Sequence, residues 1–573
     1  MVYRADGTGL LIGPVGPAEA FTGVLVRDQS VRAEVQMDDV LVRAGESRRG
    51  EEMLFCFEPA AASVDIWTRW VAITHGARLN KGRVYGWCSW YDRTTKVDEP
   101  SVMDVAETFA QNPNVFGRGI LQIDDGYQKM DGDWSGNAKF PSGMDGVAGK
   151  IRQIGWIPGV WFAPLMINPG HPWAKANPDA LQKNSQGIAS FMNANPFHPD
   201  GAQWLVPDNP ASKTFLSNII KNACERGYGY IKIDFNGIGS RFTDPTKTRL
   251  QIFRELYALY RQAAGDETYI LSCLGRPTRG VVGFVDAARV GPDSHPANFE
   301  GCLKSVLRFQ LYNNVWWHND PDVSYLAPKL ASRKVGYTPQ GEGMWKTWHN
   351  VVGLVGGTAM ISEPVKQPDV KAVWRNLEII RPSSREPARL LTLGLSPDNT
   401  IFGFSAKRPY GDFAVYNLYN STEGTKSLTL DFKAAGLPQG VKYAVFDFWA
   451  NRVIGTATNS YTTAPLDYHS SALLRFTPLD SGLPVLVGSN LHISIGATEI
   501  ENLRVSPAKV EIEFSDAGAQ EGGVTFYSTK PLVAATSENC HVSSVDKLGD
   551  NLWKVNITGR QWGKAQRLAL SIQ

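Results

Sequence analysis

Between residues 81 and 365 the chain alternates short apolar runs, typical of buried β-strands, with longer amphipathic stretches typical of helices. The strand-like runs are residues 84–91, 119–126, 157–164, 230–235, 269–275, 286–293, 314–322 and 357–362. Eight strands, each followed by a helical connection, predict a (β/α)8 barrel. A doubly wound open sheet is the main alternative, but we find no glycine-rich phosphate loop of the kind that such sheets carry.

Two of the intervening stretches show the clearest helix signals. In residues 209–227, Asn209 is placed to cap a helix, Pro210 suits its first position, and Gly227 suits a left-handed residue at its end. Apolar side chains in this stretch repeat along one helical face. Residues 248–265 show the same periodicity. The pattern therefore predicts a helix in each stretch.

The run YIKIDF at residues 230–235 carries two charges within an apolar strand. Successive strand side chains point to opposite faces, so Lys232 and Asp234 share one face. Burying a lone charge costs several kcal/mol or forces its pKa to move. Two interpretations follow from the residues. The pair is either a structural ion pair, or a reactive carboxylate kept ionised by a neighbouring ammonium at the end of a buried strand.

Polar residues gather at the carboxyl ends of the predicted strands, where barrels place their chemistry. They are Asp124, Asp125, Trp161, Lys232, Asp234, Cys273, Arg289, Asp293, His318, Asn319 and Asp320. Carboxylates on three separate strands around one mouth favour a functional site over an isolated ion pair. A metal site built from Asp124, Asp125 and His318 is disfavoured, because the nearby lysine and arginine would repel a cation. We expect neither a metal nor a cofactor.

Six segments occur in an order that resembles a known family. GWCSWY, QIDDGYQ, IPGVWFAP, YIKIDF, DAARVGPD and NDPD look like the motifs of α-galactosidases in glycoside hydrolase family 36, which shares a clan with family 27. The likeness is closest to the compact bacterial and thermophilic members, and it covers roughly residues 81–365. It implies a retaining α-galactosidase that acts on an oligosaccharide or other galactoside.

The same resemblance implies roles for individual residues. Asp234 would be the nucleophile and Asp293 the acid/base. The implied substrate-binding residues are Asp124 and Asp125 for O4 and O6 of galactose, Lys232 and Arg289 for other hydroxyls, and Trp87, Trp161 and Cys273 in the pocket wall.

The chemistry of a retaining glycosidase sets further expectations. Two carboxyl groups about 5 Å apart are needed, one to attack and one to shuttle a proton. We expect Lys232 to lower the pKa of Asp234 and keep it ionised. Asp293 should be partly buried and less compensated by cations, which suits an acid. A cation beside Asp293 would depress its pKa, so Arg289 is expected to reach the sugar or Asp234 instead.

Several alternatives stay open. The loop DSHPANFE, which begins at Asp293, carries His295 where we expect a small residue in the family, so the preference on the leaving-group side is not fixed. The enzyme could be a transglycosidase of the raffinose-synthase type, or a hydrolase of α-N-acetylgalactosaminides or β-L-arabinopyranosides. A binding module or inactive homologue is disfavoured, because a dead barrel has no physical reason to keep Asp124, Asp125, Lys232, Asp234 and Asp293.

The regions outside the barrel look β-rich. At 573 residues the chain is too long for a single core. Residues 1–80 form a short N-terminal β-rich region, smaller than the sandwich usual in family 36. Residues 366–478 resemble a C-terminal β-sandwich, and residues 479–573 continue as an additional β-rich segment, with LHISIG, KVEIEF, GVTFYS, LWKVNIT and RLALSIQ as predicted strands.

Composition narrows the possible partners. The formal net charge is only +2, which gives no reason to expect nucleic acid or an anionic membrane as partner. No uninterrupted apolar stretch is long enough to span a membrane. The six cysteines are scattered without a CxxC pair, and the N-terminus shows no signal-peptide pattern. We therefore expect a cytoplasmic protein with reduced thiols; the oligomeric state is left open.

Overall fold

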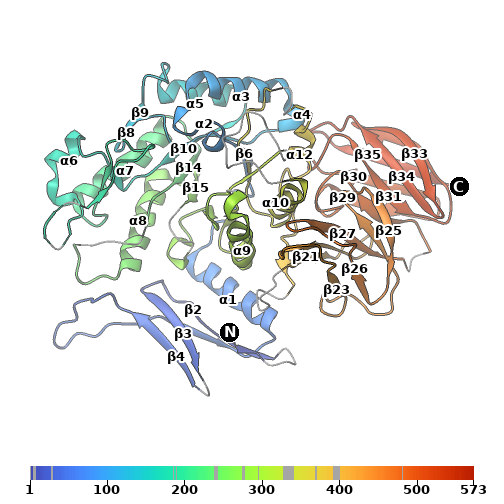
Figure 1. The fold of residues 1–573 in the computed structure, drawn as a ribbon, viewed down its shortest axis with the longest axis horizontal. Coiled ribbons are helices and arrows are strands. Elements are labelled where there is room, and N and C mark those ends of the chain that lie inside the picture. The colour runs from blue at the N-terminus through green and yellow to red at the C-terminus, as the bar shows by residue number, and fades with distance from the viewer. Residues whose placement is uncertain are drawn as a thin grey trace.

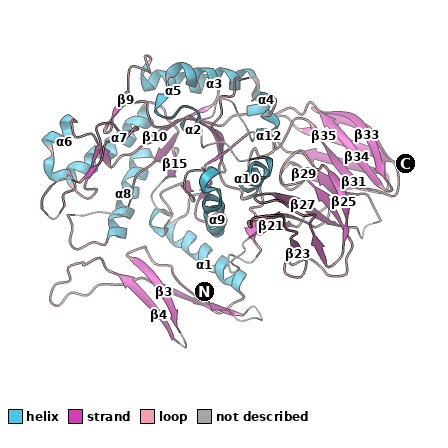
Figure 2. Ribbon diagram, in the orientation of Figure 1, coloured by secondary structure: helices cyan, strands magenta, loops and turns pink. Residues whose placement is uncertain are grey.

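The computed structural model describes residues 2–3, 8–27, 30–184, 186–188, 190–237, 243–273, 278–294, 296–326, 341–367, 371–391, 400–479 and 482–573. Helices surround a central sheet, and strands dominate the C-terminal side of the molecule (Figures 1 and 2). Within the described residues, no helix is long and apolar enough to cross a membrane.

The central sheet has nine strands in the order β17-β16-β15-β14-β10-β7-β6-β19-β18, and its neighbouring strands are parallel. The strands are β6 (Tyr85–Cys88), β7 (Ile120–Ile123), β10 (Ile157–Phe162), β14 (Tyr230–Ile233), β15 (Tyr269–Ser272), β16 (Ala287–Arg289), β17 (His318–Asp320), β18 (Val323–Ser324) and β19 (Ala359–Ile361). Each of the eight predicted runs contains one of these strands. The predicted barrel is confirmed.

The sheet curls until its two ends meet. Just before β19, the Thr358 N–H donates to the Asn319 carbonyl of β17 at 2.8 Å. The Thr358 hydroxyl donates to Asp320, also at 2.8 Å. Gly357 makes this approach possible, because a Cβ at that position would lie 1.9 Å from the Asn319 oxygen.

Helices pack on the outside of the sheet. They are α2 (Trp90–Arg93), α3 (Glu99–Gln111), α4 (Pro113–Phe116), α5 (Gly143–Gln153), α7 (Pro210–Glu225), α8 (Arg249–Ala264), α9 (Phe299–Phe309), α10 (Glu342–Leu354) and α12 (Trp374–Glu378). The two predicted helices are confirmed as α7 and α8. The Asn209 side chain caps α7 by accepting from the Ala211 and Ser212 N–H groups, and Gly227 is left-handed at φ +92°.

One connection departs from the expected pattern. Between β15 and β16 the described residues contain no α-helix, only the 3-10 turn Arg279–Val281. The predicted pattern placed a helix in every connection between consecutive strands, including this one. The strands are nevertheless paired directly, with Leu271 opposite Ala287.

Two insertions rise from the barrel rim. The first follows β7 and forms the hairpin β8 (Gln128–Met130) and β9 (Asp133–Gly136). The second, between β10 and α7, holds α6 (Pro172–Ala176) and a small sheet of β11 (Met166–Ile167), β12 (Phe191–Met192) and β13 (Ala202–Trp204). Both follow the carboxyl ends of their strands, which is the end that carries the polar residues.

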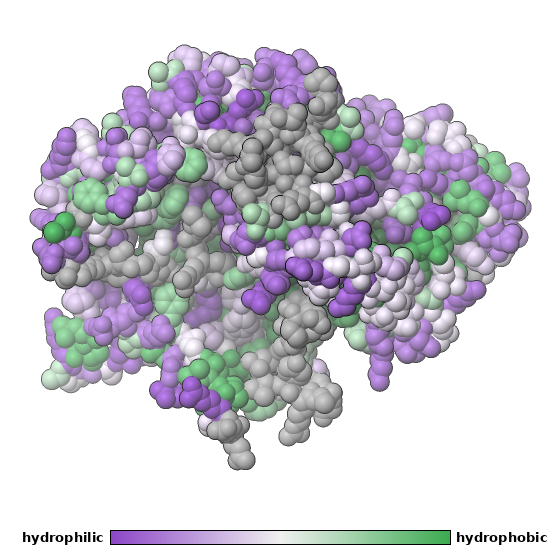
Figure 3. Space-filling view, viewed as in Figure 1, coloured by the Kyte–Doolittle hydropathy of each residue, from purple (hydrophilic) through white to green (hydrophobic). Residues whose placement is uncertain are grey.

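The N-terminal region combines strands with a helix. Strands β1 (Val2–Tyr3), β2 (Gly9–Pro14) and β5 (Met53–Cys56) form one sheet, and β3 (Phe21–Arg27) and β4 (Ser30–Gln36) form a hairpin. Helix α1 (Ala60–His75) was not predicted. Its apolar Ile66, Trp70 and Ile73 are exposed, so its pattern is not the usual amphipathic one. Figure 3 shows hydrophobic surface on the N-terminal strands at the bottom of the view.

The C-terminal residues form two successive β-structures, as predicted in outline. The first has a six-stranded sheet of β20 (Arg389–Leu390), β21 (Ile401–Ala406), β22 (Phe413–Tyr419), β27 (Ser471–Pro478), β24 (Tyr443–Asp447) and β25 (Arg452–Ala457), with the pair β23 (Thr429–Asp431) and β26 (Ser460–Thr462). The second has two four-stranded sheets. One sheet contains, in order, β28 (Val485–Ser489), β31 (Gly522–Tyr527), β34 (Leu552–Thr558) and β33 (His541–Gly549). The other contains, in order, β29 (Ile500–Val505), β30 (Lys509–Phe514), β35 (Gln566–Ile572) and β32 (Leu532–Glu538).

The predicted strand LHISIG at residues 491–496 is wrong. These residues form turns between β28 and β29, with Ile495 at φ +49° and Gly496 at φ +99°. The apolar alternation is real but serves another purpose. Ile493 and Ile495 are buried in the core shared with helix α10 of the barrel.

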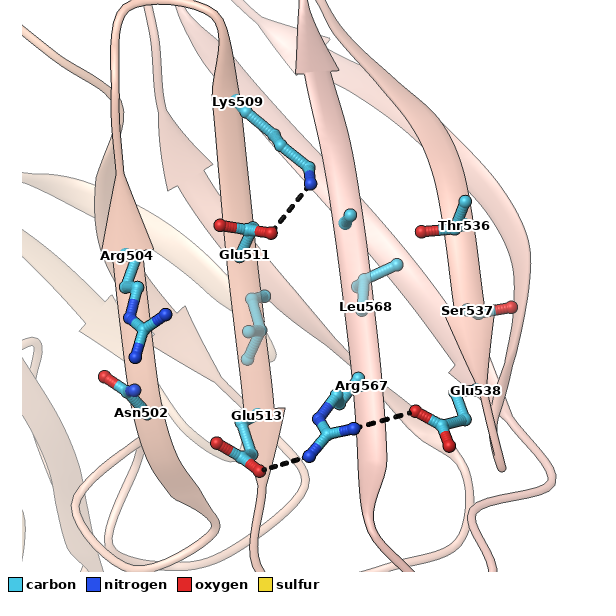
Figure 4. Close-up of a pocket in the computed structure, with 12 residues that line it drawn as sticks. Asn502, Arg504, Lys509, Glu511, Glu513, Thr536, Ser537, Glu538, Arg567 and Leu568 are labelled. Carbon is cyan, nitrogen blue, oxygen red and sulfur yellow. Dashed lines mark hydrogen bonds and ion pairs between the residues drawn. The ribbon is translucent and has the colours of Figure 1, made fainter.

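A shallow groove crosses the outer face of the sheet β29-β30-β35-β32 (Figure 4). Five of its six charged side chains pair with one another: Lys509 with Glu511 at 2.7 Å, and Arg567 with Glu513 at 3.4 Å and Glu538 at 3.2 Å. No aromatic side chain is among the residues that line it, so it offers no stacking surface for a sugar ring.

Replacing Gly357 with alanine should destabilise the barrel, because the new Cβ would clash with the backbone oxygen of Asn319. Overpacking of this kind costs about 1–3 kcal/mol, so thermal melts should show a clear fall in Tm. Gly149→Ala in helix α5 is the control. Nothing lies within 4 Å of its Cβ position, and alanine there should stabilise by about 0.5–1 kcal/mol. A wild-type melting curve for Gly357→Ala would show that the sheet ends do not meet.

Candidate active site

The polar residues predicted at the strand ends do meet at one mouth of the barrel. Alternation within each strand explains why. In β14, Ile231 and Ile233 pack outward against the helices, whereas Lys232 turns inward, and Asp234 follows on the same side. The strand therefore carries apolar packing on one face and charge on the other.

Asp124 and Lys232 form a buried ion pair across this mouth. The Lys232 ammonium donates to Asp124 Oδ2 at 3.0 Å, and both side chains are less than a tenth exposed. The Gln122 amide donates to the same oxygen at 2.5 Å, and the Cys88 thiol does so at 3.4 Å. Asp124 Oδ1 accepts from the Asp125 N–H at 3.0 Å. The carboxylate is thus fixed by donors on three strands, β6, β7 and β14.

Asp234 is held by one donor on each oxygen. The Trp161 indole N–H donates to Oδ2 at 2.9 Å. The Phe235 N–H donates to Oδ1 at 2.8 Å, and Phe235 itself has a left-handed backbone at φ +53°. The Lys232 charge lowers the pKa of Asp234, as expected, but the net shift is upward. Burial raises the pKa of Asp234, and the Lys232 charge and these two hydrogen bonds offset only part of that rise.

Lys232 pairs with Asp124 rather than with its strand neighbour Asp234. Side chains two residues apart on a strand are roughly 6.5 Å apart, beyond hydrogen-bond reach unless they bend together. The ammonium is closer to Asp124 across the mouth, at 3.0 Å. Its charge still acts on Asp234, but at longer range.

Arg289 binds three carboxylates at once. Its guanidinium donates to Asp293 at 3.1 Å, to Asp320 at 3.0 Å and to Asp322 at 2.8 Å. The expectation that Arg289 avoids Asp293 is wrong. Its contact with a sugar hydroxyl stays a prediction, because three hydrogen bonds leave two of the five guanidinium N–H groups unused. We refer to Arg289, Asp293, Asp320 and Asp322 as the arginine cluster.

Asp293 lies beyond the end of its strand, since β16 stops at Arg289. Its side chain is 55% exposed, although it was expected to be partly buried and less compensated. The exposure places it at the wet rim of the mouth, while Asp234 sits deeper at 7% exposed. Residue 295, singled out in the following loop, lies outside the described residues.

Asp322 is a member of the cluster that the sequence analysis did not single out. It is buried, accepts from the Ser294 N–H at 2.7 Å and from the Tyr91 hydroxyl, and adopts a left-handed backbone at φ +79°. Burial raises its pKa to about 6, and the Arg289 charge only partly opposes this. The motif NDPD at residues 319–322 could have indicated Asp322, because Asp320 and Asp322 are two residues apart and point to the same side of an extended chain.

Asp125 lies beside Asp124 but faces different partners. Its Oδ1 accepts from the Gln128 amide at 2.6 Å, and its Oδ2 lies 4.0 Å from the His198 ring. Burial raises the pKa of Asp125 to about 6 despite the Gln128 hydrogen bond and the His198 charge. His198 comes from the second rim insertion and had no signal in the sequence.

Cys273 lies between the two carboxylates predicted to do the chemistry. It is buried, and its N–H donates to the Ile233 carbonyl at 2.7 Å. Burial raises the pKa of its thiol, and the charges of Asp234 and Asp293 raise it further. The expected place of Cys273 in the wall of a substrate pocket stays a prediction.

Two of the residues predicted for the site, Trp87 and His318, lie away from the mouth of the barrel. Trp87 shares the outward side of its strand with Leu121 of β7, opposite to Cys88, and its indole donates to the Glu363 carbonyl at 2.8 Å. Its predicted contact with substrate is wrong for that reason. His318 begins β17 rather than ending it, and its ring contacts Asn314 at 2.7 Å. Among the described residues, no group of three histidine, cysteine or acidic side chains could hold a metal.

The raised pKa of Asp125 predicts how its removal changes stability. Because its pKa of about 6 exceeds the ordinary 3.8, the folded state binds this proton more tightly than the unfolded chain. Wild-type protein should therefore lose stability as pH rises through about 4 to 6. Asp125→Asn escapes this loss and should gain up to about 3 kcal/mol relative to wild type between pH 4 and pH 7. Denaturant unfolding at several pH values measures this, and a pH-independent difference would contradict it.

Comparisons with known proteins find α-galactosidases among the similar sequences and structures. Residues 404–476 match the model of the α-galactosidase C-terminal β-sandwich domain. The α-galactosidase AgaA of Geobacillus stearothermophilus is 25% identical over 190 residues, which is 30% of this chain and 24% of that protein. The match thus spans about a quarter of that relative's length.

Solved structures extend the likeness to the barrel. TtGalA, an α-galactosidase from Thermus thermophilus solved with stachyose, is 25% identical with a TM-score of 0.52, covering 65% of this chain and 78% of that one. A family 27 β-L-arabinopyranosidase from Geobacillus stearothermophilus is 15% identical with a TM-score of 0.53, covering 70% and 97%. The predicted family number 36 is not decided by these matches. The chain is α-galactosidase-like, with the barrel of the clan that holds families 27 and 36 and the C-terminal β-sandwich domain of α-galactosidases.

Proposed function

We propose that this chain is a retaining α-galactosidase that removes terminal α-linked galactose by double displacement. One observation carries the proposal: a buried carboxylate, Asp234, and a rim carboxylate, Asp293, flank one mouth that also holds the Asp124–Lys232 pair. Two carboxyl groups in different environments are what a retaining glycosidase needs.

In the first step an Asp234 oxygen attacks the anomeric carbon while Asp293 gives its proton to the leaving glycosidic oxygen. The glycosidic bond breaks, and a galactosyl ester forms on Asp234. In the second step Asp293 accepts a proton from water, the water oxygen attacks the same carbon, and the ester bond returns its electrons to Asp234. The Trp161 N–H and the Phe235 N–H hold Asp234 in line for both steps.

The arginine cluster carries more negative than positive charge. With every group ionised, its three carboxylates and one guanidinium sum to −2. This surplus of negative charge favours holding one proton within the cluster. The raised pKa of Asp322, about 6, reflects the same crowding of carboxylates in a buried site. The Arg289 guanidinium therefore orients Asp293, but its positive charge is shared with Asp320 and Asp322.

Asp124 and Lys232 should make the enzyme selective for galactosides. A site that pairs buried charges with an axial hydroxyl leaves them unpaired when the epimer binds, so aryl α-galactosides should be favoured over aryl α-glucosides by about 10²–10⁴-fold in kcat/KM. Asp124→Asn should abolish most of that preference. Asp124→Ala also strands the Lys232 charge, which costs about 3–5 kcal/mol of stability, so the Asn variant is the cleaner test.

Equal kcat/KM values of the wild-type enzyme on the aryl α-galactoside and the aryl α-glucoside would contradict the proposed preference for galactosides. The same assay, run with N-acetylgalactosaminide and β-L-arabinopyranoside substrates, ranks the alternative glycones. Product analysis at high concentrations of a sugar acceptor then separates hydrolysis from transfer, because a transglycosidase of the raffinose-synthase type would give mainly the transfer product.

The roles of the two aspartates can be separated with dinitrophenyl α-galactoside. This leaving group needs little protonation, so Asp293→Ala should still release a burst of phenol and then turn over slowly, because base assistance is lost. On an unactivated galactoside it should lose about 10²–10⁴-fold. Asp234→Ala should show no burst on either substrate. A burst from Asp234→Ala and none from Asp293→Ala would mean that the roles are reversed.

A further inference from the structure

We propose that His198 is a specificity-determining residue, which together with Asp125 binds the exocyclic hydroxyl of the sugar that occupies the mouth. The inference rests on the proposed function, since it concerns the same pocket. It goes further by assigning a substrate contact to a loop outside the barrel, in the insertion between β10 and α7.

His198 is a buried imidazole held between two buried carboxylates. Its Nδ1 lies 3.0 Å from Asp131 Oδ2, in the turn between β8 and β9, and its Nε2 lies 4.0 Å from Asp125 Oδ2. All three side chains are less than a tenth exposed. The other oxygen of Asp131 is buried without a hydrogen-bond partner among the described residues. Among the described residues the Asp131 carboxylate has His198 as its one hydrogen-bond partner, so Nδ1 of His198 is the donor.

The space between His198 and Asp125 has the dimensions of a hydroxyl site. A separation of 4.0 Å is too long for a direct hydrogen bond. A single oxygen can lie about 2.8 Å from both atoms at once. Such an oxygen would accept from the Nε2–H and donate its own proton to Asp125 Oδ2. Among the described residues neither of these two atoms has another hydrogen bond, so both are free for a ligand.

The chemistry of the site favours a hydroxyl over a charged group. An anion would meet Asp125 and Asp131, and a cation would meet the imidazolium. A neutral hydroxyl satisfies both an ionised donor and an ionised acceptor through charge-assisted hydrogen bonds. Burial would lower the pKa of His198, but the hydrogen bond and charge of Asp131 and the charge of Asp125 raise it, so both ring nitrogens can donate.

The position of the pair favours the exocyclic hydroxyl over those on the ring. Asp124 and Lys232 already form the inner part of the mouth, where ring hydroxyls lie when the anomeric carbon faces Asp234. His198 reaches in from the rim, where a group that extends beyond the ring would arrive. Two aromatic contacts hold the loop there: Phe235 meets the His198 ring edge to face at 6.3 Å, and Phe197 packs on Trp90 at 5.3 Å.

The test compares three aryl glycosides with the same ring: the α-galactoside, the 6-deoxy α-galactoside (α-D-fucoside), and the β-L-arabinopyranoside, which lacks the exocyclic carbon. In wild type the galactoside should be favoured. His198→Ala should lower the ratio of kcat/KM between galactoside and 6-deoxy galactoside by about 10- to 100-fold. The loss should fall on the galactoside alone. His198→Gln, which keeps a donor at similar reach, should recover part of the preference.

His171→Ala is the matched control. His171 lies in the same insertion, where its ring accepts from the Trp173 N–H at 3.1 Å to cap α6. Its removal should leave the ratio unchanged. The ratio is measured within one preparation, so it does not depend on the fraction of folded enzyme.

The outcomes separate this inference from the proposed function. If His198→Ala slows all three substrates equally, the residue is merely structural and the inference is overturned. If only the galactoside-to-glucoside ratio changes, His198 contacts O4 and the exocyclic assignment is overturned. If wild type cleaves none of the glycosides, the proposed function fails. Calorimetric binding of galactose and 6-deoxygalactose to the full chain then still tests His198, since the variant should lose the difference between the two sugars.

Discussion

The contact on which the mouth of this barrel depends is the binding of Arg289 to three carboxylates, at 2.8 to 3.1 Å. A buried charge is costly unless it is paired, and replacing such pairs with apolar side chains often stabilises a protein. Stability alone therefore does not account for the arginine cluster. It joins β16 to Asp320 at the end of β17 and to Asp322 just after it. It also fixes the rim carboxylate Asp293 relative to the strand ends that carry the other polar residues.

Much of the fold could be predicted from the sequence, because apolar alternation and helix caps act locally. The first four residues of the run YIKIDF form β14, and Asn209 caps α7 as its position indicated. The errors arose where one pattern serves two structures. LHISIG has the alternation of a strand, yet left-handed residues at Ile495 and Gly496 turn it into buried loops. Helix α1 escaped prediction because several of its apolar side chains, Ile66, Trp70 and Ile73, are exposed.

The candidate site was predictable in its residues more than in its pairings. Strand parity brought Lys232 and Asp234 to the same face, but it could not show that Lys232 would find Asp124 across the mouth at 3.0 Å. The alternation of side chains along β6 also places Trp87 on the outward face, opposite to Cys88. The position of Trp87 inside the motif GWCSWY suggested a pocket residue instead. His198 had no signal at all, because a loop residue far along the chain reaches Asp125 only through the three-dimensional path of the insertion.

The two aspartates assigned to the chemistry differ in both their burial and their partners. Asp234 ends a buried strand and is clamped by the Trp161 and Phe235 N–H groups, so its oxygens have little freedom to turn. Asp293 follows the strand end, is 55% exposed and is tethered by one guanidinium. A nucleophile gains from rigid alignment with one carbon. An acid/base must give a proton to one oxygen and later take one from water. Placing the second carboxylate at the rim therefore suits it to exchange protons with both the leaving group and solvent.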